Sequence, residues 1–135
     1  MKTTRRWATT AAALYVLWGL LHVGLGLSMV ISTLAEGPPT TELTAESLMF
    51  FLCAALLGAQ AVFVALTMTR TNNRLGYWLN TAVLGVVDVA FLLVLVLPGH
   101  VDLVGGISGP VLWLVATACA TAARNHETRP APTAH

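Results

Sequence analysis

The chain has 135 residues, of which 56% are hydrophobic and only 10% are charged, and its formal net charge is +1. A soluble domain carries roughly 25% charged residues, so this composition predicts a single membrane-embedded domain instead. The few basic residues are scattered along the chain and form no continuous stripe, which argues against a nucleic-acid partner.

The first apolar run covers residues 8–34 and follows Lys2, Arg5 and Arg6. A basic start of this kind is also typical of a signal peptide. However, the apolar core of a signal peptide spans roughly 7–15 residues, and this run is clearly longer and contains His22. We therefore predict that residues 8–34 form an uncleaved membrane span.

The second predicted span covers residues 46–69. It follows residues 36–42, a polar stretch with adjacent prolines that cannot be helical throughout. Thr44 is a candidate N-cap for this helix and Ser47 is the alternative, because a hydroxyl oxygen can accept a hydrogen bond from a free backbone N–H of the first turn.

The third predicted span covers residues 75–97. A tight polar turn of turn-favouring residues, Thr71 to Asn73, leads into it. Pro98 and Gly99 are expected to end it, because proline cannot continue a helix and glycine is common just beyond a helix end.

The fourth apolar run, residues 101–123, is interrupted by the glycine-rich segment 105–110. Two readings compete: a short interfacial piece followed by a helix that starts near Ser108, or one helix with a kink at Pro110. A helix from Ser108 to Ala123 would be about 24 Å long, short for a hydrocarbon core of about 30 Å. We expect a kinked or broken fourth span, followed by a disordered cytoplasmic tail over residues 125–135.

The basic residues alternate with the apolar runs. They precede the first run, separate the second from the third and follow the fourth, as Lys2, Arg5, Arg6, Arg70, Arg74, Arg124 and Arg129. The two remaining connectors carry Glu36, Glu42 and Asp102 and no basic residue. Because cytoplasmic loops collect Lys and Arg, the sequence predicts an all-α bundle of four transmembrane helices in the cell membrane, with both termini in the cytoplasm.

His22 and Asp88 are the ionisable residues that lie well inside the predicted spans. Counted from the cytoplasmic side, His22 lies about 21 Å deep and Asp88 about 20 Å deep. An ionised aspartate in lipid is costly, so Asp88 should face the bundle interior and find a hydrogen-bond donor. Histidine can be that donor, and we predict that His22 and Asp88 are partners.

Glycine precedes each of these residues by three positions, as Gly19 and Gly85, and Gly26 lies on the same face of the first span. Residues three or four apart share a helix face, and small residues let helix backbones approach closely. We expect these glycines to be helix-packing positions beside the polar site.

A buried His–Asp pair can also be a plain interhelical clip, since hydrogen bonds of this kind contribute about 0.6 kcal/mol on average. An intramembrane ionisable residue is nevertheless a functional candidate, so both interpretations stay open. Gln60 and Asn80 are weaker candidates for the same site. Trp18, one turn before His22, either packs between helices or walls a pocket for an apolar ligand.

No cofactor is expected. His22 and Asp88 alone give too few ligands for a structural zinc site, and one buried histidine is weak support for haem. A membrane enzyme that acts on a lipid or a quinone is a third, less favoured function, and no soluble catalytic motif is present in the sequence. Cys53 and Cys119 should lie roughly 18 Å apart in depth, so we expect two small apolar core residues and no disulfide.

Two functions remain open from the sequence. In the first, the polar site formed by His22 and Asp88 binds a small amphipathic ligand or relays protons. In the second, the chain is an accessory or structural subunit that docks a larger membrane protein or forms a homo-oligomer within the lipid bilayer.

Overall fold

The computed structural model describes residues 2–128, and every regular element in that range is helical. In chain order the elements are α1 (Lys2–Ala35), α2 (Glu42–Thr67), the 3-10 turn η1 (Thr69–Thr71), α3 (Arg74–Trp78), the π-helical turn η2 (Leu79–Val83), α4 (Leu84–Phe91), the π-helical turn η3 (Leu92–Val96) and α5 (Leu103–Thr128). Elements α3, η2, α4 and η3 follow one another without a break, and we call them together the third helix.

Four helical stretches are long and apolar enough to cross a membrane, judged by length and composition: Thr3–Ala35, Glu42–Thr71, Arg74–Val96 and Leu103–Glu127. The predicted set of four long apolar helices is thereby confirmed. Large apolar side chains also cover the outside, and Ile31, Leu43 and Leu97 are 67%, 76% and 73% exposed. Monomeric soluble proteins rarely carry apolar surfaces of this extent.

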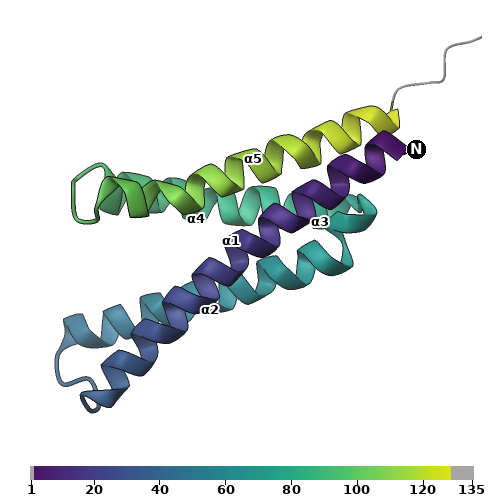
Figure 1. The fold of residues 1–135 in the computed structure, drawn as a ribbon. Coiled ribbons are helices and arrows are strands. Elements are labelled where there is room, and N and C mark those ends of the chain that lie inside the picture. Colours follow the sequence, from purple (N-terminus) through teal and green to yellow (C-terminus); the bar gives the residue numbers. More distant parts are fainter. Residues whose placement is uncertain (1, 129–135) are drawn as a thin grey trace, which may run out of the picture.

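The helices are arranged as a V (Figure 1). Helices α1 and α2 form one arm, and the third helix and α5 form the other. The arms pack together where the chain begins and diverge toward the opposite end. We call the packed end the basic end, because it holds the described arginines Arg5, Arg6, Arg70, Arg74 and Arg124, and we call the other the open end.

Helix α2 begins at Glu42, earlier than predicted. Its N-cap is Thr41, whose Oγ1 accepts a hydrogen bond from the backbone N–H of Thr44 at 3.2 Å. The predicted caps Thr44 and Ser47 are therefore wrong. Helical geometry is allowed once the prolines are passed, so a hydroxyl that follows them closely, that of Thr41, can cap the helix.

The predicted turn into the third helix is confirmed. Asn72 adopts the left-handed conformation with φ 57°, and Oδ1 of Asn73 accepts from the backbone N–H of Leu75 at 2.8 Å. At the other end, Gly99 takes φ +82° directly after Pro98, beyond the last helical turn. A left-handed residue at this place favours glycine, as the sequence predicted.

Two π-helical turns within the third helix are not visible in the apolar pattern. A π turn accommodates an extra residue and rotates the side chains that follow. In η2, the Asn80 amide Nδ2 donates to the carbonyl of Ala61 at 3.3 Å, and the Thr81 carbonyl accepts from the Trp113 indole at 3.1 Å. Contacts with α2 and α5 therefore accompany the wider turn.

Helix α5 contains Pro110 and runs without a break, so the reading of one helix through Pro110 is confirmed, and the reading of a short piece followed by a new helix near Ser108 is wrong. Asp102 starts the helix, with Oδ2 accepting from the backbone N–H of Gly105 at 2.7 Å. A side chain at Gly106 would come within 2.7 Å of Val96, so this glycine permits close packing on η3. The helix also extends to Thr128, which corrects the predicted disorder for residues 125–128, whereas residues 129–135 lie outside the described range.

Small residues and one buried tyrosine hold the basic end together. The Tyr15 hydroxyl is hydrogen-bonded to Thr81 Oγ1 at 3.2 Å and to Thr117 Oγ1 at 2.9 Å, which joins α1, the third helix and α5. The alanines packed around it are Ala11, Ala12, Ala61, Ala65, Ala116 and Ala120. Their small side chains let the helices approach closely, as is typical of helix packing in membranes.

Candidate functional site

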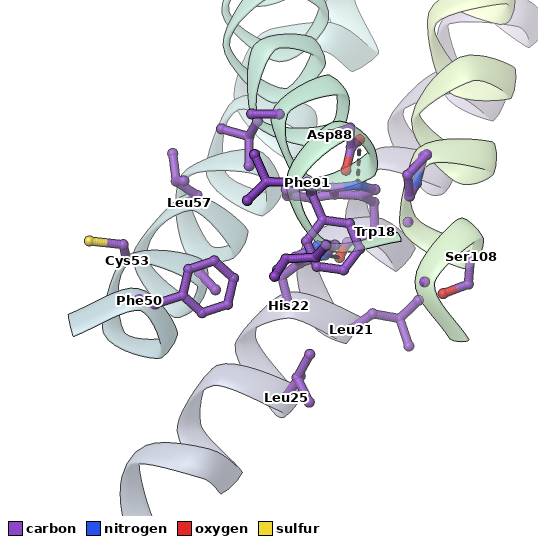
Figure 2. A pocket seen from close by; sticks show the side chains of 18 of the residues that line it. Trp18, Leu21, His22, Leu25, Phe50, Cys53, Leu57, Asp88, Phe91 and Ser108 are labelled. Atoms are coloured by element: carbon purple, nitrogen blue, oxygen red, sulfur yellow. Dashed lines mark hydrogen bonds between the residues drawn. The ribbon is translucent and has the colours of Figure 1, made fainter. Parts of the chain in front are cut away.

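A cavity of about 760 Å³ lies between the two arms of the V, on the side of the open end (Figure 2). Every helix contributes to its wall, with Leu25 from α1, Phe50 from α2, Phe91 from α4 and Pro110 from α5 as examples. Sites for small molecules usually measure roughly 300–1,000 Å³ and are mostly apolar with a few polar groups. This cavity has both properties.

Asp88 forms part of the inner wall and is only 2% exposed. Its Oδ2 accepts a hydrogen bond from the Trp18 indole Nε1–H at 3.1 Å, and its Oδ1 has no hydrogen-bond partner among the described residues. No described lysine or arginine pairs with it. The predicted donor, His22, is therefore wrong, because the indole of Trp18 takes that place.

His22 lies beside Trp18 in the same wall. Its Nδ1–H donates to the Trp18 carbonyl at 2.8 Å, and its ring stacks on the indole with centroids 3.7 Å apart and planes inclined by 19°. A carbonyl can only accept, so the hydrogen of the neutral ring sits on Nδ1 and leaves Nε2 as an acceptor. Nε2 has no hydrogen-bond partner within residues 2–128. His22 and Asp88 thus line one cavity with Trp18 between them.

The glycine-rich start of α5 lies directly against His22 in the cavity wall. A side chain at Gly109 would come within 3.1 Å of His22 Cε1 and 3.5 Å of the Trp18 indole nitrogen. Glycine at this position therefore leaves the space that the two rings occupy. The glycine-rich segment predicted a kinked or broken helix, and in the structure its Gly109 leaves room for the two rings.

Sequence reasoning missed two aromatic residues of the cavity, Phe50 and Phe91. Phe91 follows Asp88 by three positions, so the shared helix face was a usable signal. Phe50 lies in a uniformly apolar stretch of α2, where nothing in the pattern distinguishes it from its neighbours.

Gln60 and Asn80 do not line the cavity. Gln60 Nε2 donates to Asn80 Oδ1 at 3.3 Å, and the fully buried Asn80 also bonds the Ala61 carbonyl. Gln60 Oε1 is buried without a partner in the described part of the chain. These two residues form a separate link between α2 and the third helix.

The three predicted packing glycines lie at close helix contacts. A Cβ at Gly19 would lie 2.5 Å from the Gly58 carbonyl oxygen, and one at Gly26 would lie 2.5 Å from that of Phe51. Both glycines therefore bring α1 against the backbone of α2. Gly85 faces α5 instead, where a Cβ would lie 2.5 Å from the Trp113 ring.

The two cysteines differ in their position relative to this site. Cys53 and Cys119 are both free. Cys119 is buried, whereas Cys53 is exposed and lies in the cavity wall, which corrects its prediction as a core residue. Within residues 2–128 no group of three or more His, Cys, Asp and Glu side chains is placed to hold a metal ion.

Trp18→Phe is expected to destabilise the fold by about 1–2 kcal/mol, because Asp88 loses its hydrogen-bond donor while a ring remains beneath His22. Denaturant titration in mixed micelles measures this change. The matched control is a double-mutant cycle with Asp88→Leu, which removes the acceptor of this hydrogen bond. If the hydrogen bond is the cause, the two changes are not additive, and strict additivity would contradict the assignment.

Comparison of the chain with protein-family models, curated proteins and solved structures finds no match in any of the three. The proposal that follows therefore rests on the residues and geometry described above.

Proposed function

We propose that this chain spans the cell membrane four times, with both termini in the cytoplasm, and binds a small amphipathic molecule in the cavity between its two arms. The observation that carries the binding proposal is the pair of unpartnered polar atoms in an apolar wall, Asp88 Oδ1 and His22 Nε2. A ligand with one polar end and one apolar end matches such a wall.

The orientation is supported by the distribution of charge over the two ends of the bundle. The basic end holds all the described arginines, whereas the open end holds Glu36 and Asp102 in its connectors and Glu42 in the first turn of α2. Segments rich in Lys and Arg stay in the cytoplasm. In this orientation the cavity opens toward the outer half of the membrane.

The cavity itself favours ligand binding over a proton relay. A relay needs a continuous chain of hydrogen-bonding groups that leads from the site to one side of the membrane. Among the described residues, the hydrogen bonds of Asp88 and His22 reach only Trp18 and do not continue to Tyr15 and Thr81. A bound molecule therefore explains the unpartnered atoms more directly.

The opening between the arms also supports a second candidate function. A helix of a larger membrane protein, or of a second copy, would fit the apolar surface of Leu25, Phe50 and Val94 near the open end. The chain would then be an accessory subunit, and the contact between Trp18 and Asp88 would be an interhelical clip.

Native mass spectrometry of the protein, purified from its membrane in mild detergent, separates these functions. We expect the mass of one chain plus one small molecule, because the cavity has room for a single drug-sized ligand. Co-purification of a second protein in fixed ratio would favour the accessory subunit. A bare monomer would contradict both functions.

A further inference from the structure

We propose that the molecule bound in the cavity is an amphipathic organic cation, such as an alkylammonium, whose charged group pairs with Asp88. This inference rests on the proposed function, namely that the cavity binds a small amphipathic molecule. It adds the charge and the chemical class of the ligand.

The first support is the charge of the wall. Asp88 is the one acidic residue among those that line the cavity, and the lining contains no lysine or arginine. An ionised carboxylate inside a membrane is costly unless an opposite charge neutralises it. No described lysine or arginine side chain supplies a positive charge to Asp88, so we infer that the ligand supplies it.

The second support is the hydrogen-bonding character of the free polar atoms. Asp88 Oδ1 accepts when ionised, and His22 Nε2 accepts because Nδ1 carries the hydrogen. The Ser108 hydroxyl donates its hydrogen to the Gly105 carbonyl at 2.7 Å, which leaves its oxygen as a further acceptor. A wall of acceptors selects a ligand rich in donors, and a primary ammonium offers three N–H groups.

The third support is the set of aromatic side chains in the cavity wall. Trp18, Phe50 and Phe91 all contribute to the wall that contains Asp88, as Figure 2 shows. The faces of aromatic rings attract cations, and the attraction grows when water is excluded. The remaining wall is aliphatic and suits the hydrocarbon part of the ligand.

The experiment uses a photoreactive alkyl diazirine analogue of decanol, bound to the full-length protein in detergent and attached by light. Unlabelled decylamine, decanol and decanoate then compete with this probe. These competitors share one chain length and differ in charge. We expect decylamine to displace the probe at a concentration at least about tenfold below that of decanol, because a hydrogen bond to a charged group is worth at least this factor. We expect decanoate to displace the probe less well than decanol.

Asp88→Asn is the matched variant, because its amide oxygen can still accept from Trp18 while the charge is lost. We expect the preference for decylamine over decanol to fall to within about threefold in this variant. Comparing this preference between the wild-type protein and the variant in the same detergent cancels the different partition of the two competitors into micelles. Should the variant fail to fold, the order in which the three competitors displace the probe from the wild-type protein still tests whether the ligand is a cation.

The outcomes distinguish the two levels of the proposal. If decanol and decylamine displace the probe from the wild-type protein equally well, the proposal of a cationic ligand is wrong, whereas the proposal of a binding cavity stands. A preference for decylamine that persists in Asp88→Asn also overturns the pairing with Asp88. If none of the three displaces the probe, the proposed function fails as well.

Discussion

Ala54→Trp is expected to reduce attachment of the photoreactive decanol probe by at least about tenfold, the largest effect on binding that we predict. Ala54 is half-buried on α2 and lines the cavity. An indole at this position takes up space that the ligand needs, whereas the hydrogen bond between Trp18 and Asp88 stays in place. Probe attachment per protein molecule, measured by intact mass, gives the result.

The control for this substitution is Ala13→Trp. Ala13 is exposed on α1 and does not line the cavity, so the same indole there faces outward. Probe attachment should stay within about twofold of the wild-type value. Equal attachment in the two variants would mean that the probe binds outside the cavity.

Gly19→Val is expected to destabilise the fold by about 3 kcal/mol, the largest effect on stability that we predict. Its Cβ would lie 2.5 Å from the Gly58 carbonyl oxygen and 2.7 Å from Val62 Cγ2. Backbone cannot yield as a flexible side chain can, so α1 and α2 must separate. Unfolding in mixed micelles with increasing SDS, followed by tryptophan fluorescence, measures the loss.

Gly24→Val on the same helix is the control. No atom lies within 4 Å of a Cβ built at Gly24, so the valine meets open space. The change in unfolding free energy should stay within about 0.5 kcal/mol. A loss equal to that of Gly19→Val would show that the destabilisation does not come from the contact with α2.

The apolar runs predicted the four helices because each run exceeds the length of an ordinary buried helix. The Asn72–Asn73 turn and the end of the third helix followed from residues with a strong local preference for one conformation. Such features depend on neighbours in the sequence, so a single sequence is enough to predict them.

The errors arose where a contact between distant segments overrides a local preference. Pro110 and the glycines before it suggest a break, yet α5 continues because Asp102 caps it and Gly106 packs on Val96. The π turn at Asn80 likewise accompanies hydrogen bonds to other helices. No periodicity in the sequence reports these contacts.

The candidate site was predicted in part. Counting residues along the helices placed His22 and Asp88 at one depth, and both line the same cavity. The count could not identify the donor to Asp88, because depth says nothing about which way a side chain turns around its helix. Trp18 reaches the carboxylate, and His22 bonds the Trp18 carbonyl instead.

The positions at which the decanol probe attaches to the wild-type protein test the central claim most directly. Peptide sequencing by mass spectrometry should find the attached probe on cavity residues from more than one helix. The expected sites are Leu25 of α1, Phe50 of α2 and Phe91 of α4. Attachment confined to outward-facing residues such as Ile31 and Leu43 would contradict a binding cavity between the arms.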